Sequence, residues 1–205
     1  MKKYIITCTL LLAIPIIPFI YFGTSFEEQS AAWLCKQQSP DAVACAVITL
    51  LTIDVFLPIP SSIVCTISGA ALGLFWGTIA STLGMTSGAL LGFLLGRVLG
   101  NKIMKHFTTE NETKQYNELI KRYGTATLIL LRPVPLFAEA STLWLGCSSM
   151  SIIKFTAATL PIHVLLSLLY ASFGQYLGIT LGATLSVAVA LAMSFLANRM
   201  LKTKE

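Results

Sequence analysis

The sequence predicts an all-α polytopic membrane protein, and two observations carry that prediction. First, 55% of the 205 residues are hydrophobic and only 11% are charged, whereas roughly a quarter of the residues in a soluble domain are charged. Second, the runs Val55–Gly96 and Phe155–Asn198 contain no Asp, Glu, Lys or Arg. Each run is longer than the roughly 20 residues that one helix needs to cross a membrane. We therefore expect several crossings within one membrane domain.

The chain begins with Lys2-Lys3 and an apolar run over residues 4–22. Such a run resembles a secretory signal, but no small-residue cleavage pattern precedes Glu27, which favours a retained helix. The segment 23–41 carries more acidic than basic residues, as is typical of a loop outside the cytoplasm. Residues 1–41 are thus expected to form an N-terminal transmembrane helix and an outer loop, with the N-terminus in the cytoplasm.

Basic residues outnumber acidic ones between Arg97 and Arg122, and they recur after Asn198. The positive-inside rule assigns both segments, and hence the C-terminus, to the cytoplasm. Loops on opposite sides of the membrane require an odd number of crossings between them. We expect a membrane domain over 42–178, made of a first repeat (42–100), a cytoplasmic loop (101–122) and a second repeat (123–178), followed by a C-terminal transmembrane helix and basic tail (179–205).

Two proline motifs interrupt the apolar material. Pro58-Ile59-Pro60 precedes a full-length apolar stretch at 77–96, and Arg132-Pro133-Val134-Pro135 precedes another at 150–174. Proline cannot continue the helical hydrogen-bond ladder, and irregular backbone at membrane depth must be buried in protein or face a water-filled cavity. Each motif therefore predicts the tip of a re-entrant helical hairpin, followed by a transmembrane helix. Since the hairpins start from opposite sides, the halves form an inverted repeat, which in transporters surrounds a site near the midplane.

The order and spacing of these motifs between Ile53 and Gly178 resemble the DedA/VTT-domain family, also called SNARE-associated Golgi protein-like. The matching features are Pro58-x-Pro60, Gly69-Ala-Ala-Leu-Gly73, Gly84, Gly88, Gly92, Gly96-Arg97-x-x-Gly100, Arg132-Pro-Val-Pro135, Gly146, Met150 and Phe155. The resemblance implies two facing re-entrant hairpins that move phospholipid or a polyprenyl-phosphate carrier between leaflets, with dependence on the proton-motive force. Many members carry an acidic residue where Ser61 and Ser62 stand, and a second arginine where Ala138 and Glu139 stand.

Charged residues near the proline motifs are the main candidates for a transport site, because charge at membrane depth is costly and commonly functional. Arg132 is expected to bind a lipid phosphate, since its planar guanidinium can contact two oxygens. Asp54 or Glu139 is expected to take up and release a proton. The alternative is that Arg132 neutralises one of these acids and holds the hairpins together. Ser61 and Ser62 would line the cavity or satisfy the carbonyls of the broken helix.

Other candidates have structural or relay roles. The hairpins would be shaped by six residues, Pro58, Pro60, Pro133, Pro135, Gly69 and Gly146. His163 follows Pro161 in a predicted span and is a candidate proton relay or a packed neutral histidine. Arg97 and Lys154 are expected to anchor helix ends at the membrane surface. Gly84, Gly88, Gly92 and Gly96 form a stripe that we expect to pack within the chain.

We therefore expect a flippase-type transporter of the bacterial plasma membrane, not an enzyme, whose partners are membrane lipids, lipid-linked phosphate and protons. A non-transporting scaffold for envelope or lipid homeostasis is one alternative. An intramembrane lipid-phosphate enzyme is another, although it would need a nucleophile or metal cluster. The five cysteines lack metal-ligand spacing, which predicts no metal or cofactor. Basic residues flank apolar runs instead of forming a patch, which argues against nucleic acid.

Overall fold

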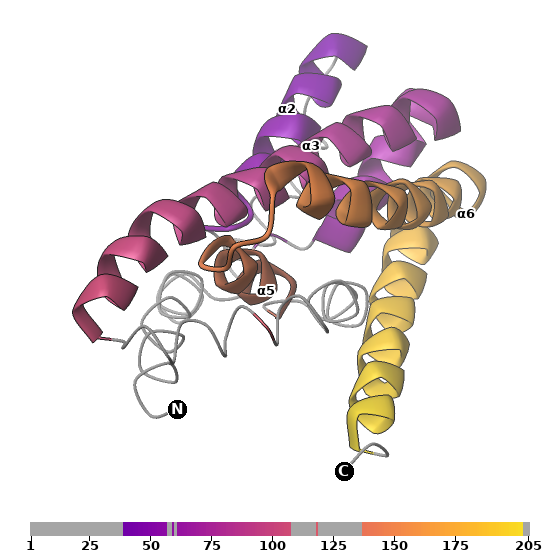
Figure 1. The fold of residues 1–205 in the computed structure, drawn as a ribbon. Helices are drawn as coiled ribbons and strands as arrows, with labels where there is room; N and C mark the ends of the chain where they lie inside the picture. The colour runs from indigo at the N-terminus through magenta and orange to yellow at the C-terminus, as the bar shows by residue number, and fades with distance from the viewer. Residues whose placement is uncertain (1–38, 57–58, 60, 108–117, 119–136, 203–205) are drawn as a thin grey trace.

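The computed structural model describes residues 39–56, 59, 61–107, 118 and 137–202, and all its regular elements are helices (Figure 1). These are α2 (Pro40–Ile53), α3 (Ser61–Phe107), α5 (Phe137–Gly146) and α6 (Ile152–Lys202). The all-helical prediction is therefore confirmed for this part of the chain. The predicted N-terminal helix at 4–22 lies outside the described residues. The predicted division into domains stays a prediction.

The short helix α2 begins with a standard N-terminal cap. The Ser39 hydroxyl accepts a hydrogen bond from the backbone N–H of Ala42 at 3.3 Å, and Pro40 occupies the first turn, where no N–H partner is needed. Asp41 places a negative charge near the positive end of the helix dipole. With 14 residues, α2 is about 21 Å long, which is shorter than the roughly 30 Å hydrocarbon core of a bilayer.

Each long helix is divided by one glycine with positive φ. Gly73 in α3 has φ 78° and ψ 170°, and Gly178 in α6 has φ 74° and ψ 175°. Only glycine adopts such a conformation readily. The kinks divide α3 into 61–72 and 74–107, and α6 into 152–177 and 179–202. Figure 1 shows the second segment of α6, in yellow, turning sharply away from the first.

Two stretches are long and apolar enough to cross a membrane, Ser61–Gly100 and Ile152–Val189. Both are longer than the expected spans at 77–96 and 150–174, because the first stretch also includes the helix before the Gly73 kink and the second continues past the Gly178 kink. Helix α3 continues through Gly84, Gly88, Gly92 and Gly96, whereas Gly73 kinks it.

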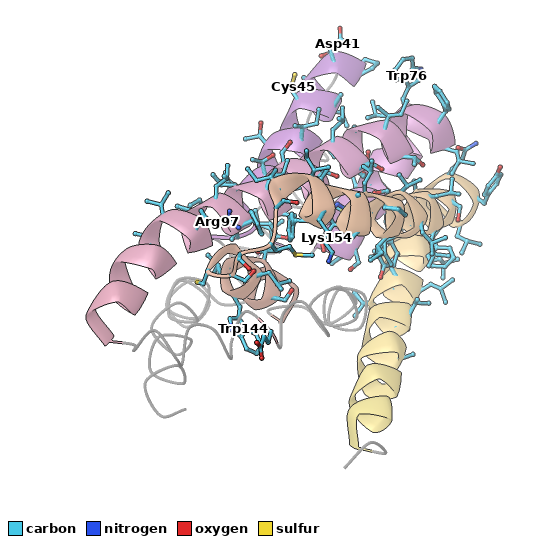
Figure 2. All side chains as sticks on the ribbon, viewed as in Figure 1. Asp41, Cys45, Trp76, Arg97, Trp144 and Lys154 are labelled. Atoms are coloured by element: carbon cyan, nitrogen blue, oxygen red, sulfur yellow. The ribbon has the colours of Figure 1, made fainter. Side chains whose placement is uncertain are left out.

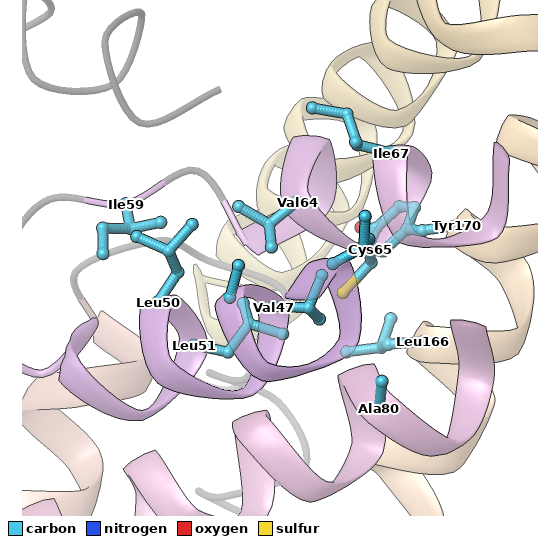
Figure 3. Packing of buried hydrophobic residues seen from close by; sticks show 12 residues of the cluster. Val47, Leu50, Leu51, Ile59, Val64, Cys65, Ile67, Ala80, Leu166 and Tyr170 are labelled. Carbon is cyan, nitrogen blue, oxygen red and sulfur yellow. The ribbon is translucent and has the colours of Figure 1, made fainter. Parts of the chain in front are cut away.

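The main apolar core lies where α2, the first segment of α3 and α6 meet (Figure 3). Leu51 of α2, Val64 of α3 and Leu166 of α6 are buried in this cluster. A second cluster joins α3, α5 and α6, and in it the rings of Phe93 and Phe155 stack at 4.4 Å between centroids. Thus α3 contacts every other described helix.

The predicted glycine stripe does pack within the chain. A Cβ added to Gly84 would lie 2.8 Å from the Leu51 side chain, and one added to Gly88 would lie 2.4 Å from the Leu51 carbonyl oxygen. Further along, a Cβ on Gly96 would lie 2.0 Å from the Leu143 carbonyl oxygen. The bare stripe therefore lets α3 approach α2 at one end and α5 at the other.

Candidate functional site

The first proline motif lies in the turn between α2 and α3, and Asp54 is at its start. Asp54 is the C-cap of α2, and its Oδ1 accepts a hydrogen bond from the backbone N–H of Ile59 at 3.3 Å. The Asp54 side chain is half-buried and Ile59 is buried. Asp54 therefore closes the turn that carries the prolines. Pro58 and Pro60 themselves lie outside the described residues.

Ser61 and Ser62 are the first two residues of α3 and are half-buried. They stand at a helix N-terminus, where backbone N–H groups lack helical partners. The Ser62 carbonyl accepts a hydrogen bond from the Thr66 hydroxyl at 2.8 Å. The structure therefore brings Asp54, Ser61 and Ser62 into one turn, as their closeness in sequence requires.

The second proline motif, Arg132 to Pro135, lies outside the described residues. Glu139 belongs to α5, but its side chain also lies outside the described part of the chain. Whether Arg132 and Glu139 meet Asp54 therefore stays a prediction. What the structure does describe is how the end of α5 is attached to the rest of the molecule.

Arg97 holds the end of α5, a role that the sequence analysis did not predict. Its Nε donates to the Gly146 carbonyl at 2.8 Å, and its Nη2 donates to the carbonyls of Ser148 at 3.0 Å and Met150 at 2.5 Å. The guanidinium also lies 4.7 Å from the centre of the Phe93 ring. Arg97 thus satisfies carbonyls at the end of α5 and in the turn that leads to α6 (Figure 2).

Two glycine crossings join the two halves of the chain. A Cβ on Gly69 would lie 2.1 Å from the Ala171 carbonyl oxygen, and one on Gly174 would lie 1.8 Å from that of Thr66. At the other crossing, a Cβ on Gly146 would lie 2.1 Å from the Phe93 carbonyl oxygen, and Gly96 approaches α5 as described above. In each crossing, a short segment after a proline motif packs against the long helix of the other half.

Polar contacts also connect α3 with α6. The hydroxyls of Thr66 and Ser186 are 2.6 Å apart, and the Thr86 hydroxyl lies 3.0 Å from Nδ1 of His163. The Gln175 side-chain oxygen accepts a hydrogen bond from the backbone N–H of Leu74, just after the Gly73 kink. His163, predicted as a relay or a packed residue, is fully buried. These partners are far apart in sequence, so no local signal could have revealed them.

Among the described residues, no group of three or more His, Cys, Asp or Glu side chains could hold a metal ion. The thiol of Cys147 is buried and lies 3.3 Å from the Leu143 carbonyl oxygen and 3.4 Å from that of Gly96. The thiol of Cys45 is exposed and free. The described geometry is therefore one of helix crossings, a capped turn and buried hydroxyls.

Comparison with known proteins identifies the family. The family model described as the VTT domain matches residues 59–176, more than half of the chain. The match begins in the first proline turn and ends just before the Gly178 kink, so it contains both glycine crossings. No curated protein and no solved structure matches. Together with two helices that are long and apolar enough to span a bilayer, the match shows that the chain belongs to the VTT-domain family of membrane proteins.

Proposed function

We propose that this protein moves phospholipid or a polyprenyl-phosphate carrier between the leaflets of a membrane. The observation that carries the proposal is a pair of short apolar helices around the first proline turn, inside the VTT-domain match. Helix α2 and segment 61–72 of α3 share one buried core, and each is about 18–21 Å long. Neither can cross a bilayer of about 30 Å alone. Together they suit a re-entrant hairpin.

The depth of this hairpin in the membrane is inferred from the residues at the two ends of the long helical segments 74–107 and 152–177. At one end, Trp76 is 65% exposed and Tyr176 is 70% exposed, as suits aromatic side chains at a membrane surface. At the other end lies Arg97, which contacts the Met150 carbonyl, and Lys154 is in the first turn of α6 just after it. Trp76 and Arg97 are about 32 Å apart along α3, and Lys154 and Tyr176 are about 33 Å apart along α6. Both lengths fit the hydrocarbon core.

Ser61 precedes the Gly73 kink by about 18 Å of helix. The proline turn therefore lies near the middle of the bilayer, if Gly73 lies at the level of Trp76. Asp54 and the first turn of α3 then offer a carboxylate, hydroxyls and backbone N–H groups that lack helical partners at the depth that a lipid headgroup must pass. Such a headgroup would bind the N–H groups and hydroxyls through its phosphate oxygens.

The two halves form an inverted repeat in this proposal, and the reciprocal glycine crossings support it. Gly69 and Gly146 occupy corresponding places after the two proline motifs, and each contacts the long helix of the other half. By this symmetry the second motif faces the first across the midplane. Arg132 then binds the lipid phosphate, and Asp54 or Glu139 takes up and releases a proton.

The orientation follows from charge. Arg97 begins the basic segment that the positive-inside rule assigns to the cytoplasm, and Lys154 lies at the same end of the helices because Arg97 contacts the carbonyl of Met150. The aromatic end then faces outward. We infer a bacterial plasma-membrane protein with both termini in the cytoplasm.

The test is translocation of a fluorescent phospholipid and a polyprenyl phosphate in proteoliposomes of equal protein content. We expect Arg132→Ala to slow translocation at least about tenfold, since a hydrogen bond to a charged group contributes about 1.5–3 kcal/mol. Asp54→Asn and Glu139→Gln are tested beside it. Lys154→Ala, which removes an exposed basic side chain, is the matched control and should leave translocation unchanged.

Three results would contradict this proposal. Wild-type protein that moves neither lipid would favour a scaffold. Release of inorganic phosphate from the polyprenyl phosphate would favour an enzyme. Equal rates for wild type and Arg132→Ala would remove the phosphate-binding role of that arginine.

A further inference from the structure

The second segment of α6 contacts the short first segment of α3, and Thr66 lies inside the bend of α6. The Thr66 carbonyl oxygen would be 1.8 Å from a Cβ added to Gly174, which precedes the kink. The Thr66 methyl group would be 2.9 Å from a Cβ added to Gly182, which follows the kink. The Thr66 hydroxyl lies 2.6 Å from that of Ser186. Both segments of α6 therefore meet the helix that follows the first proline turn.

The second segment of α6 contacts α3 through a narrow stripe. Gly182, Ser186 and Val189 recur three or four residues apart, so they share one face of the helix. Ser186 is fully buried, and Val189 packs against the main core. Large apolar side chains on the flanks and the opposite face are exposed, namely Ile179, Leu181, Leu185 and Val187. The segment thus presents small and polar groups to α3 and a broad apolar surface to lipid.

The kink of α6 has open space around it. Gly178 has φ 74° and ψ 175°, and a Cβ added there would meet nothing within 4 Å. On the inner side of the bend, a Cβ added to Gly182 would already lie 2.8 Å from the Phe173 carbonyl oxygen. Hinges are a few residues that absorb changes in φ and ψ, and glycine does so at low steric cost. The bend of α6 can therefore widen, although it has little room to narrow.

The kink of α3, in contrast, is braced by hydrogen bonds. The Gln175 side-chain oxygen accepts a hydrogen bond from the backbone N–H of Leu74, directly after Gly73. Across the same bend, the Ser68 hydroxyl donates to the Gly77 carbonyl at 3.2 Å. These contacts hold the two segments of α3 at a fixed angle. Of the two kinks, the one in α6 is better suited to move.

The polar contact between the two segments can break without leaving a hydroxyl unpaired. The Thr66 hydroxyl also lies 2.8 Å from the Ser62 carbonyl oxygen, and the Ser186 hydroxyl lies 2.7 Å from that of Gly182. Two hydroxyls supply two hydrogens for these three contacts. After separation, each hydroxyl can still donate to the carbonyl one turn earlier in its own helix. The pair is therefore a contact that can open and close again.

The contact lies between the membrane surface and the proline turn. Thr66 is about 10 Å of helix from Gly73, and Ser186 is about 12 Å from Gly178, so both arms reach a similar depth. Ser62 is one turn before Thr66, on the same face of α3. A lipid keeps its chains in hydrocarbon while its charged headgroup must avoid it. An opening along this face would give the headgroup a polar path and leave the chains in the bilayer.

We propose that the second segment of α6 is a lateral gate for lipid. It turns about Gly178, separates Ser186 from Thr66 and opens the face that carries Ser62 and Thr66 to a phosphate headgroup from the bilayer. The identity of the substrate rests on the proposed function, since the gate names the route by which a lipid reaches the proline turn. The movement itself does not depend on that function.

The first test locks the gate with a disulfide. Oxygen atoms 2.6 Å apart stand near the S–S bond length of about 2.0 Å, so Thr66→Cys with Ser186→Cys should cross-link on oxidation. The five native cysteines are replaced by alanine in this variant. In proteoliposomes, we expect oxidation to abolish translocation of a fluorescent phospholipid and reduction to restore it. The two single-cysteine variants are the matched controls and should not respond to the oxidant. Equal translocation by the cross-linked and the reduced protein would overturn the gate.

The second test measures the movement directly. Ala71 on the first segment of α3 and Val187 on the gate are both exposed, so spin labels there leave the packing undisturbed. In the cysteine-free chain in lipid nanodiscs, electron paramagnetic resonance should show a shorter and a longer distance between the labels. Gly178→Ala should raise the share of the longer distance, because alanine disfavours the positive φ of the closed bend. A single distance that Gly178→Ala leaves unchanged would overturn the gate.

The two tests separate the gate from the proposed function. Wild-type protein that moves no lipid but shows both distances would contradict the proposed function and leave the movement in place. Translocation that persists in the cross-linked protein would support the proposed function and refute the gate. If the reduced double-cysteine variant is itself inactive, the distances between the spin labels decide.

Discussion

Replacing Arg97 by alanine should detach the end of α5 from α3. The variant loses hydrogen bonds to three carbonyls, those of Gly146, Ser148 and Met150. Hydrogen bonds to a charged group contribute about 1.5–3 kcal/mol each, and carbonyls left without partners in a dry site add a penalty. Because two of the bonds share one nitrogen, the contributions do not simply add. We expect a loss of about 3–5 kcal/mol in the free energy of unfolding.

The comparison with lysine separates charge from geometry. Arg97→Lys keeps the positive charge, but a single ammonium cannot reproduce a planar fork that reaches three carbonyls. We expect it to lose about half as much stability as the alanine variant. Lys154→Ala is the control, since it removes an exposed positive charge near the same end of the helices and should change stability by less than about 0.5 kcal/mol.

The assay is reversible unfolding in mixed detergent micelles, with increasing sodium dodecyl sulfate and helix content as the signal. Fluorescence of Trp144, which lies on α5, reports in a single-tryptophan background whether α5 detaches before the rest unfolds. If Arg97→Ala is as stable as Lys154→Ala, the guanidinium bonds do not hold α5 and this reasoning is refuted.

Three further predictions follow from the helix crossings and the membrane depth. Gly174→Ala should lower the free energy of unfolding by about 1–3 kcal/mol, since its Cβ would lie 1.8 Å from the Thr66 carbonyl oxygen. The same unfolding assay measures this loss, and a variant as stable as the wild type would contradict the close crossing. A double-mutant cycle of Thr66→Val and Ser186→Ala should give a coupling of about 0.5–1.5 kcal/mol, and strict additivity would argue against their 2.6 Å contact. Fluorescence of Trp76, as the sole tryptophan, should be quenched more by brominated lipids labelled near the headgroup than by those labelled near the chain end, and the reverse order would contradict its placement at the membrane surface.

Local sequence signals were sufficient for several features of the fold. The all-helical class follows from hydropathy, and the in-chain packing of Gly84, Gly88 and Gly96 follows from their four-residue spacing. Gly73, one of the glycines that match the family pattern, kinks α3 through a positive φ. Gly84, Gly88 and Gly96 do not end the helix, because a glycine within a close helix crossing provides space for the neighbouring backbone.

The candidate site was predictable only in part. Asp54, Ser61 and Ser62 are near in sequence, so their common turn needed no tertiary information. The acceptors of Arg97 lie about fifty residues away, and they depend on which face of α3 meets α5. An arginine that anchors a helix at the membrane surface and one that hydrogen-bonds to the end of another helix have the same sequence signal, because both stand at the end of an apolar run.

By itself, the sequence determined the membrane class, the helical content of the described residues, the turn between α2 and α3 and the membership that the VTT-domain match bears out. These features depend on composition and on spacings within one helix or turn. Only the tertiary structure decided that Arg97 holds α5, that Gly69 meets Ala171 and that Thr86 meets His163. Such contacts depend on the rotation and crossing point of helices that are distant in sequence, and many faces of an apolar helix are chemically alike, so packing alone selects among them.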